Sequence, residues 1–156
     1  MKVRLRPAAT ADIPHFLDFH SEEEGRRLAA FASHGSPEPE AFAAHWRAIL
    51  ANDSSIERTI VVDETVAGYV AHFEQLGRPS ISYWIGRAWW GRGVASAAVA
   101  AFLPLVAVRP LFARVAKDNQ ASLRVLEKNG FGKVGEDQGF AAARGYEVEE
   151  WILSLG

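Results

Sequence analysis

The sequence predicts one α/β (α+β) domain over residues 1–156, with a mixed, mostly antiparallel central sheet and about four flanking helices. Three observations lead to this prediction. A chain of 156 residues, 49% of them hydrophobic, is long enough to bury one core. Short turns separate the strand-like runs of the first half, which favours antiparallel hairpins. A strand–helix–strand pattern in the second half favours one parallel pair with a right-handed crossover.

The expected strands are runs rich in β-branched and aromatic residues, and most of them alternate between apolar and polar positions. Residues 63–65 and 77–79 have turn composition and separate the middle strands. A Gly/Ala-rich loop, residues 139–145, is expected to join the last two strands. The strands are expected at residues 3–6, 59–62, 66–74, 81–85, 111–115, 131–134 and 147–155.

Two amphipathic helices are expected before the second strand. Thr10 is expected to cap the first, which places Phe16 and His20 on one face. The second follows a proline-containing loop and carries Trp46 on its apolar face. Between them, the acidic run at 22–24 favours a helix start or a solvated charged face. Its functional alternative is an acidic lip that attracts a cationic amine.

The other two helices lie in the second half of the chain. One covers residues 94–103 and is ended or kinked by Pro104. The last is capped by Asp118 or Asn119 and closed by Gly130. The first of these two begins where a strand ends, which is a favoured position for ligands in α/β sheets.

Composition and charge exclude several classes of function. A formal net charge of −2 gives no electrostatic footprint for nucleic acid or an anionic membrane. The chain has no cysteine, which excludes a disulfide framework, a thiolate nucleophile and a cysteine zinc site. Its five histidines show no metal-ligand spacing, so no metal is expected. Because no signal peptide or apolar run of spanning length is evident, we expect a cytoplasmic protein.

A glycine loop between the 81–85 strand and the following helix carries the main functional signal. Gly91 and Gly93 allow the backbone to approach a ligand closely, because no Cβ blocks it. The first N–H groups of a helix lack internal partners and carry about half a positive charge, so they bind phosphate well. Arg92 adds a fixed positive charge. The loop is neither a P-loop nor a Rossmann fingerprint, since Ser96 stands at the third glycine of the latter.

Two segments in this order resemble the cofactor-binding motifs of the GNAT N-acetyltransferase superfamily. The first is Gly91-Arg92-Gly93-Val94-Ala95, similar to the pyrophosphate loop of that family. The second covers residues 118–131 and is similar to its second cofactor segment. The resemblance is strong over residues 80–132, and the spelling is closest to the branch that includes the ribosomal-protein N-terminal acetyltransferases. Trp90 stands where the family has Arg or Gln.

The resemblance implies a splayed parallel strand pair and a site for acetyl-CoA, the acetyl donor. The backbone of Tyr83, Trp84 and Ile85 would pair with the pantetheine arm, and Asn119 would reach the arm from the other side. Amides of the loop and first helical turn would hold the pyrophosphate. These amides belong to Gly91, Arg92, Gly93, Val94, Ala95 and Ser96.

The implied chemistry is direct attack of a primary amine on the thioester, without a covalent enzyme intermediate. Leu126 stands where the family commonly has a tyrosine acid, and Ser122, one turn earlier, is the candidate acid. Alternatively, Ser122 is a helix-start residue that bonds its own backbone. Arg114 stands where some relatives have a glutamate base. Glu74 or His72, acting through water, are the candidates for that base.

The acceptor is expected to be a primary amine, either a peptide or protein N-terminus or a small molecule. An α-amine, with a pKa near 7.7–8, needs less help to deprotonate than lysine, which favours an α-amine. The 139–145 loop is a candidate acceptor-binding loop, with Arg144 available for a carboxylate. The chain is expected to be a monomer or homodimer. The alternative function is a noncatalytic CoA-binding or regulatory module with the same fold.

Overall fold

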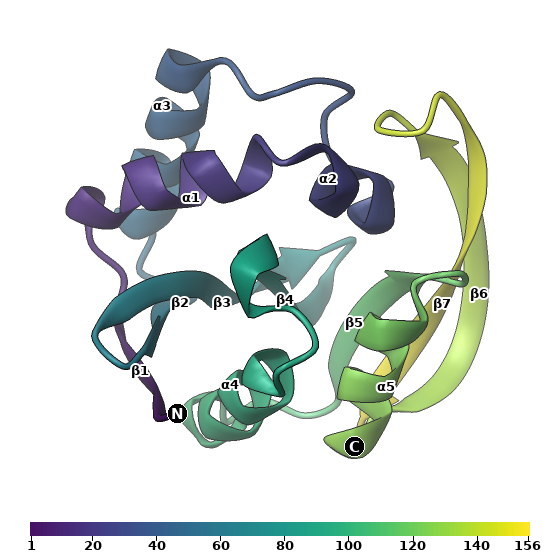
Figure 1. The fold of residues 1–156 in the computed structure, drawn as a ribbon. Coiled ribbons are helices and arrows are strands. Elements are labelled where there is room, and N and C mark those ends of the chain that lie inside the picture. Colours follow the sequence, from purple (N-terminus) through teal and green to yellow (C-terminus); the bar gives the residue numbers. More distant parts are fainter.

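A seven-stranded sheet forms the centre of the protein, in the order β1-β2-β3-β4-β5-β7-β6 (Figure 1). The computed structural model describes residues 1–156. The strands are β1 (Val3–Pro7), β2 (Ile56–Val62), β3 (Thr65–Gln75), β4 (Arg78–Ile85), β5 (Leu111–Ala116), β6 (Gly132–Ala141) and β7 (Tyr146–Leu155).

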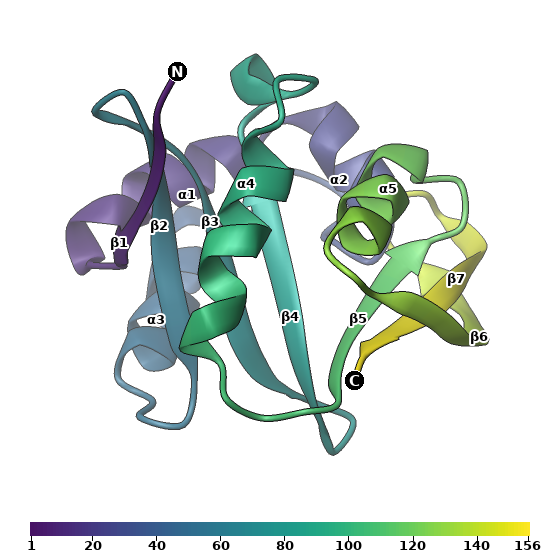
Figure 2. The same cartoon turned by 90° about the horizontal axis from the view of Figure 1, so that it is seen from below.

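Five α-helices flank this sheet. They are α1 (Ile13–His20), α2 (Glu23–Ala29), α3 (Pro39–Leu50), α4 (Val94–Phe102) and α5 (Gln120–Lys128). Helices α1, α2 and α3 cover one face, and α4 and α5 cover the other (Figures 1 and 2). None of the helices is long and apolar enough to span a membrane.

All strand pairs are antiparallel except β4 and β5, which confirms the predicted fold class. Helix α4 forms the crossover between these two parallel strands. Their pairing is restricted to one position, where Ser80 lies opposite Phe112. Beyond this position the two strands separate.

Alternation along the strands divides the apolar side chains between two layers. On β3, Val70 belongs to the main core, which also contains Phe102 of α4 and Leu126 of α5. Its neighbour Tyr69 points to the other face and packs with Phe16 of α1 and with Trp46 of α3. The sheet therefore separates an aliphatic core from a smaller aromatic cluster.

The C-terminal hairpin corrects one prediction. Strand β6 continues to Ala141, well past the predicted end at residue 134, so residues 139–141 are strand and the turn is limited to residues 142–145. Most residues of β6 are exposed or half-buried, because β6 is the edge of the sheet. An exposed edge strand has no need for alternating apolar residues, and therefore its sequence gives little sign of it.

The N-terminal helices correct a second prediction, that Thr10 caps the first helix. Thr10 does not cap α1, because it lies in a 3₁₀ turn over Thr10–Asp12 that precedes the helix. The acidic run begins a separate helix, as expected of a helix start: the Glu22 side chain accepts hydrogen bonds from the amides of Glu24 and Gly25.

Asp12 joins β1, the 3₁₀ turn and β2 through one buried carboxylate. It accepts two hydrogen bonds from the Arg6 guanidinium at 2.7 and 2.8 Å, one from the Ala9 amide at 2.9 Å and one from the Thr59 hydroxyl at 2.8 Å. Burial alone would raise the pKa of Asp12, but these hydrogen bonds and the Arg6 charge outweigh burial and lower the pKa to about 2.

We expect Asp12→Ala to lower the free energy of unfolding by about 2–4 kcal/mol at pH 7, because it leaves three donors without their acceptor. The exposed Asp18, on the same helical segment, supplies the control: Asp18→Ala should change the free energy by less than about 0.5 kcal/mol. Urea unfolding measures both.

The folded-state pKa of Asp12 lies below its ordinary value of 3.8, so the ionised carboxylate stabilises the fold above that pH. The difference between wild type and Asp12→Ala should shrink as the pH falls from about 4 toward about 2. A difference that does not change over this range would contradict the assignment.

Candidate functional site

A cleft of about 1130 Å³ opens where β4 and β5 separate. Residues 81–85 of β4 and 113–116 of β5 form its two sides. Past Ser80, β4 pairs with β3 on one edge only, so its other edge carries backbone groups without a strand partner. The cleft is as large as the upper range of small-molecule pockets, about 300–1,000 Å³. It passes between the parted strands and reaches both faces of the sheet, since residues of α3 and α5 both line it.

The glycine loop closes one end of this cleft. Gly91 and Gly93 adopt left-handed conformations, with φ of 71° and 79°. No atom lies within 4 Å of the place where a Cβ would stand on either residue, so the space in front of the loop is open. Gly93 is the N-cap of α4 and offers no side chain to the first amides of the helix. These amides are therefore available to a ligand.

Two tryptophans hold the loop in place. The Trp90 indole donates a hydrogen bond of 2.8 Å to the Ile85 carbonyl at the end of β4. Trp90 thus anchors the loop at the position where the family has Arg or Gln. Arg92 lies with its guanidinium 4.8 Å from the Trp89 ring centroid and does not line the cleft.

The structure brings together nearly all residues predicted for the cofactor. Of these, only Arg92 is absent from the lining of the cleft. The residues present are Tyr83, Trp84, Ile85, Gly91, Gly93, Val94, Ala95, Ser96 and Asn119.

Two cations that the sequence analysis did not single out lie at the same end. Arg124 and Lys128 are one turn apart on α5, are exposed, and line the cleft. Neither forms an ion pair within the protein. Their i, i+4 spacing, next to the second motif, was the available signal.

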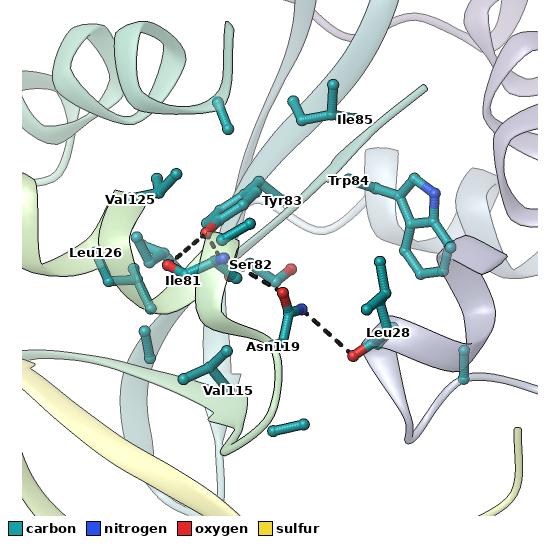
Figure 3. Close-up of a pocket in the computed structure, with 18 of the residues that line it drawn as sticks. Leu28, Ile81, Ser82, Tyr83, Trp84, Ile85, Val115, Asn119, Val125 and Leu126 are labelled. Atoms are coloured by element: carbon teal, nitrogen blue, oxygen red, sulfur yellow. Dashed lines mark hydrogen bonds between the residues drawn. The ribbon is translucent and has the colours of Figure 1, made fainter. Parts of the chain in front are cut away.

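Ser122 and Tyr83 meet inside the cleft. The two hydroxyl oxygens lie 2.5 Å apart, and Tyr83 reaches from β4 to the first turn of α5 (Figure 3). The Ser122 hydroxyl therefore pairs with Tyr83 rather than with its own helix. Burial raises the pKa of Tyr83 to about 12, and the Ser122 hydrogen bond lowers it only in part, so the phenol is protonated at neutral pH.

Asn119 has two structural partners. Its side-chain oxygen accepts a hydrogen bond of 3.3 Å from the Ser122 amide, which confirms the predicted N-cap. Its side-chain nitrogen donates to the Leu28 carbonyl of α2 at 3.3 Å (Figure 3). Asn119 thus connects α5 to α2 across the cleft.

His20 lies on the opposite side of the sheet from Ser122. Its ring stacks on Trp84, with centroids 3.8 Å apart, and its Nε2 lies 2.8 Å from the Tyr69 hydroxyl. Burial, followed by the charges of Arg26 and His45, lowers the pKa of His20 to about 4. The imidazole is therefore neutral at pH 7 where it lines the cleft.

The two predicted bases lie elsewhere. Glu74 is exposed near the end of β3, opposite Pro79, and does not line the cleft. His72 does not line it either, and both of its ring nitrogens are buried without a hydrogen bond. These positions argue against Glu74 or His72 as the base: both share the face of β3 that carries Val70, whereas Tyr69 and Phe73 point into the cleft.

A carboxylate that the sequence analysis missed does line the cleft. Glu150 of β7 accepts a hydrogen bond of 2.5 Å from Arg114 of β5. The same Arg114 nitrogen donates to Asp137 of β6 at 2.9 Å. Glu150 stands beside the position where some relatives of the resembled family carry a glutamate. The sequence shows it only as one of several acidic residues on a strand, so no local signal distinguished it.

Arg144 is not available for a carboxylate of an acceptor. It forms two hydrogen bonds to Asp118, of 2.5 and 2.8 Å, and donates to the Arg27 carbonyl at 2.8 Å. Its side chain is only 3% exposed. The prediction of a free Arg144 was wrong, because the turn folds back onto the end of α2.

Comparison with known proteins agrees with this geometry. The family model described as acetyltransferase (GNAT) domain matches residues 2–132. The uncharacterized N-acetyltransferase p20 of Bacillus licheniformis is 29% identical over 118 residues, which span 67% of this chain and 66% of that protein.

Two solved structures share the fold over nearly the whole chain. The ribosomal-protein-alanine N-acetyltransferase of Brucella melitensis is 18% identical, with a TM-score of 0.81 over 97% of this chain and 98% of that one. A GNAT superfamily phosphinothricin acetyltransferase from Sinorhizobium meliloti, solved in complex with AcCoA, is 18% identical. Its TM-score is 0.79 over 100% of this chain and 90% of that one.

The neutral His20 makes the stability of the protein sensitive to acid. Its folded-state pKa lies below the ordinary 6.5, so its contribution is complete above about pH 6.5 and is lost as the pH falls toward about 4. We expect the free energy of unfolding to lose about 1–3 kcal/mol from this group over that range.

His20→Gln should remove this component and give a flatter dependence of the unfolding free energy on pH between 4 and 6.5. His15→Gln, at an exposed position of the same helix, should leave the slope unchanged. Urea unfolding at a series of pH values makes the comparison, and equal slopes for wild type and His20→Gln would refute a neutral, buried imidazole.

Proposed function

Because the chain belongs to the GNAT acetyltransferase family, we propose that it is an acetyl-CoA-dependent N-acetyltransferase that acts on a primary amine. The observation that carries this proposal is the cleft, which connects the glycine loop on one face of the sheet with the aromatic layer on the other. Such a passage allows a donor and an acceptor to meet between the parted strands.

The residues around the cleft fit acetyl-CoA, which supplies an activated acetyl thioester when bound. The uncapped amides of α4 suit a pyrophosphate, and Arg124 and Lys128 are free to pair with phosphate oxygens. The unpaired edge of β4 beyond Ser80 suits the amide groups of the pantetheine arm. The side-chain nitrogen of Asn119 can contact the arm only if its hydrogen bond to the Leu28 carbonyl breaks.

The protein accelerates the reaction mainly by holding amine and thioester together, an effect worth up to about 7–11 kcal/mol. Ser122 assists the leaving group: Tyr83 holds the Ser122 oxygen, and the Ser122 hydroxyl donates a hydrogen bond toward the departing sulfur, directly or through water. The acceptor enters from the face covered by α1, α2 and α3, past His20 and Trp84.

We further propose that the acceptor amine is an α-amine or another amine of low pKa, at a peptide or protein N-terminus or in a small molecule. The shared fold is compatible with either kind of acceptor, because the Brucella melitensis protein is named a ribosomal-protein-alanine N-acetyltransferase and the Sinorhizobium meliloti protein a phosphinothricin acetyltransferase. The motif sequences resemble most closely those of the branch that includes the ribosomal-protein N-terminal acetyltransferases, and this resemblance supports an N-terminal acceptor.

One observation favours a second candidate, a noncatalytic CoA-binding module. Leu126, at the position where the family commonly has a tyrosine acid, is 1% exposed and belongs to the main core. It offers no proton to a leaving group. Turnover of acetyl-CoA with any amine excludes this candidate, whereas binding without turnover supports it.

Acetyl-CoA at about a hundred times its dissociation constant should stabilise the wild type by about 2.7 kcal/mol, which thermal unfolding detects. Gly93→Glu should abolish this shift, because it places a carboxylate against the phosphates. Gly77→Glu is a matched control: its φ is 75°, its Cβ position is equally open, and it lies in the β3–β4 turn outside the cleft.

Both variants strain a left-handed residue by about 1–2 kcal/mol, so both should melt earlier than wild type without ligand. Only Gly77→Glu should keep the ligand-induced shift. A full shift in Gly93→Glu would place the phosphates elsewhere, and no shift in a folded wild type would refute the acetyl-CoA assignment.

Ser122→Ala should lower kcat by about 10²-fold or more, with the acetyl-CoA-induced thermal shift retained. It removes only the hydroxyl, since the Asn119 cap contacts the Ser122 amide. Tyr83→Phe leaves the Ser122 hydroxyl in place and should lower kcat by a smaller factor than Ser122→Ala. Steady-state rates with a panel of peptide amines test both, and a wild-type rate in Ser122→Ala would show that water alone serves the leaving group.

A further inference from the structure

The two ends of the cleft differ in their free charge. Arg124 and Lys128, at the end proposed for acetyl-CoA, have no acidic partner. On the other face of the sheet, Arg26 is buried without an acidic partner, but it donates to the His20 carbonyl and does not line the cleft. Four other arginines near the cleft are paired with carboxylates. Arg27 binds Glu24, Arg87 binds Glu22, Arg144 binds Asp118, and Arg114 binds Glu150 and Asp137.

The last of these clusters has one negative charge in excess, because the single Arg114 guanidinium faces two carboxylates. Glu150 is only 8% exposed and lines the cleft. Its Oε1 accepts the Arg114 hydrogen bond, whereas Oε2 accepts none from the protein. Oε2 keeps some solvent contact inside the cleft and has no donor from the protein, so it is open to a donor brought by a ligand.

Alternation along β7 places Glu150 on the acceptor face. Glu150 shares a face with Val148, which packs with Ala30 at the end of α2. Leu153 points the other way, into the main core beside α5. Glu149 also points the other way and binds Lys117, whose ammonium lies over Trp151.

The same cleft has an aromatic wall on the acceptor face. Phe42, Tyr69 and Trp84 line the cleft together with the neutral His20. Burial raises the pKa of Tyr69, so its hydroxyl also stays neutral. An apolar group next to the reacting amine would pack on this wall.

We infer that Glu150 is the anchor and proton acceptor for the acceptor ammonium, and that the site selects an amine beside an apolar group with no free carboxylate next to it. A peptide N-terminus or an amino-acid amide with an apolar side chain has this chemistry. A free amino acid does not, because its carboxylate would lie next to Glu150, and no unpaired arginine or lysine lines this end of the cleft to receive it. This inference rests on the proposed acetyltransferase function.

Proton balance is complete for this step. The acceptor ammonium gives one proton to Glu150, which passes it to solvent. The neutral nitrogen then forms the C–N bond as the C–S bond breaks, and the second nitrogen proton ends on sulfur with the help of Ser122 or water. The products are an amide, a free thiol and one released proton.

The test compares kcat/KM for leucine amide and for leucine, each calculated on the concentration of the unprotonated amine. This calculation removes the effect of the higher amine pKa of the free amino acid and leaves the neighbouring carboxylate as the difference. Wild type should favour leucine amide by at least about 30-fold. Glu150→Gln keeps an oxygen for Arg114 but removes the charge; it should raise KM for leucine amide, lower kcat/KM by about 100-fold, and bring the amide-to-acid ratio near one.

Glu149→Gln, at the neighbouring position on the opposite face, should keep wild-type values. Asp137→Asn removes the other carboxylate on Arg114 at a half-exposed position outside the cleft, and it should reduce the ratio about threefold. It also tests the charge argument if Glu150→Gln does not fold. In each variant the acetyl-CoA-induced thermal shift should remain.

The outcomes separate the two proposals. If wild type binds acetyl-CoA and acetylates amines but uses leucine as well as leucine amide, the inference is wrong and the proposed function stands. The inference is also wrong, and the proposed function stands, if the ratio of kcat/KM for leucine amide to that for leucine is unchanged in both Glu150→Gln and Asp137→Asn. If wild type acetylates no amine, the proposed function fails, and the role of Glu150 is refuted with it.

Discussion

The separation of β4 from β5 is the constraint on which the rest of the structure depends. A parallel pair that holds together only at Ser80 and Phe112 leaves one edge of β4 without partners in the middle of the protein. Unpaired backbone groups are costly when they are buried, so the gap must stay open to water or to a ligand. The site is thus a consequence of incomplete strand pairing.

Contacts from both faces hold the two halves of the sheet together around this gap. On one side, α4 and α5 meet over the main core, where Phe102 and Leu126 are buried. On the other side, the end of α2 is tied to the C-terminal half. Asn119 and Arg144 donate to carbonyls of α2, and the Ala143 amide donates to the Ala30 carbonyl. The gap is therefore bridged without being filled.

Charge is distributed along the cleft in a way that matches two different ligands. Free cations and uncapped helical amides lie at one end, whereas an excess carboxylate and, separately, aromatic rings line the cleft on the other face of the sheet. Between them, the hydroxyl pair of Tyr83 and Ser122 stands next to the parted strands. Leu126 and Arg114 stand where the resemblance leads one to expect an acid and a base. Ser122 lies one turn before Leu126, and Glu150 contacts Arg114.

The sequence by itself determined the features that depend on nearby residues. The glycine loop at 91–93, the Asn119 cap and the strand–helix–strand segment are each set by local backbone conformation and short-range hydrogen bonds. For the same reason the residues predicted to bind the cofactor were identified from local patterns, and all of them except Arg92 line the cleft. The extent of β6 could not, because an exposed edge strand carries no apolar alternation.

Only the tertiary structure decided which distant side chains share the acceptor end. Glu150 meets Arg114 across 36 positions, and His20 meets Tyr69 across 49. Both contacts depend on strand register and on how a helix packs over the sheet, and a shift of one residue in a strand would turn Glu150 to the opposite face. Glu74 was a plausible base for its chemistry, but the pleat of β3 directs it away from the cleft. Side-chain type can be read along the chain, whereas the partner of each side chain follows from long-range packing.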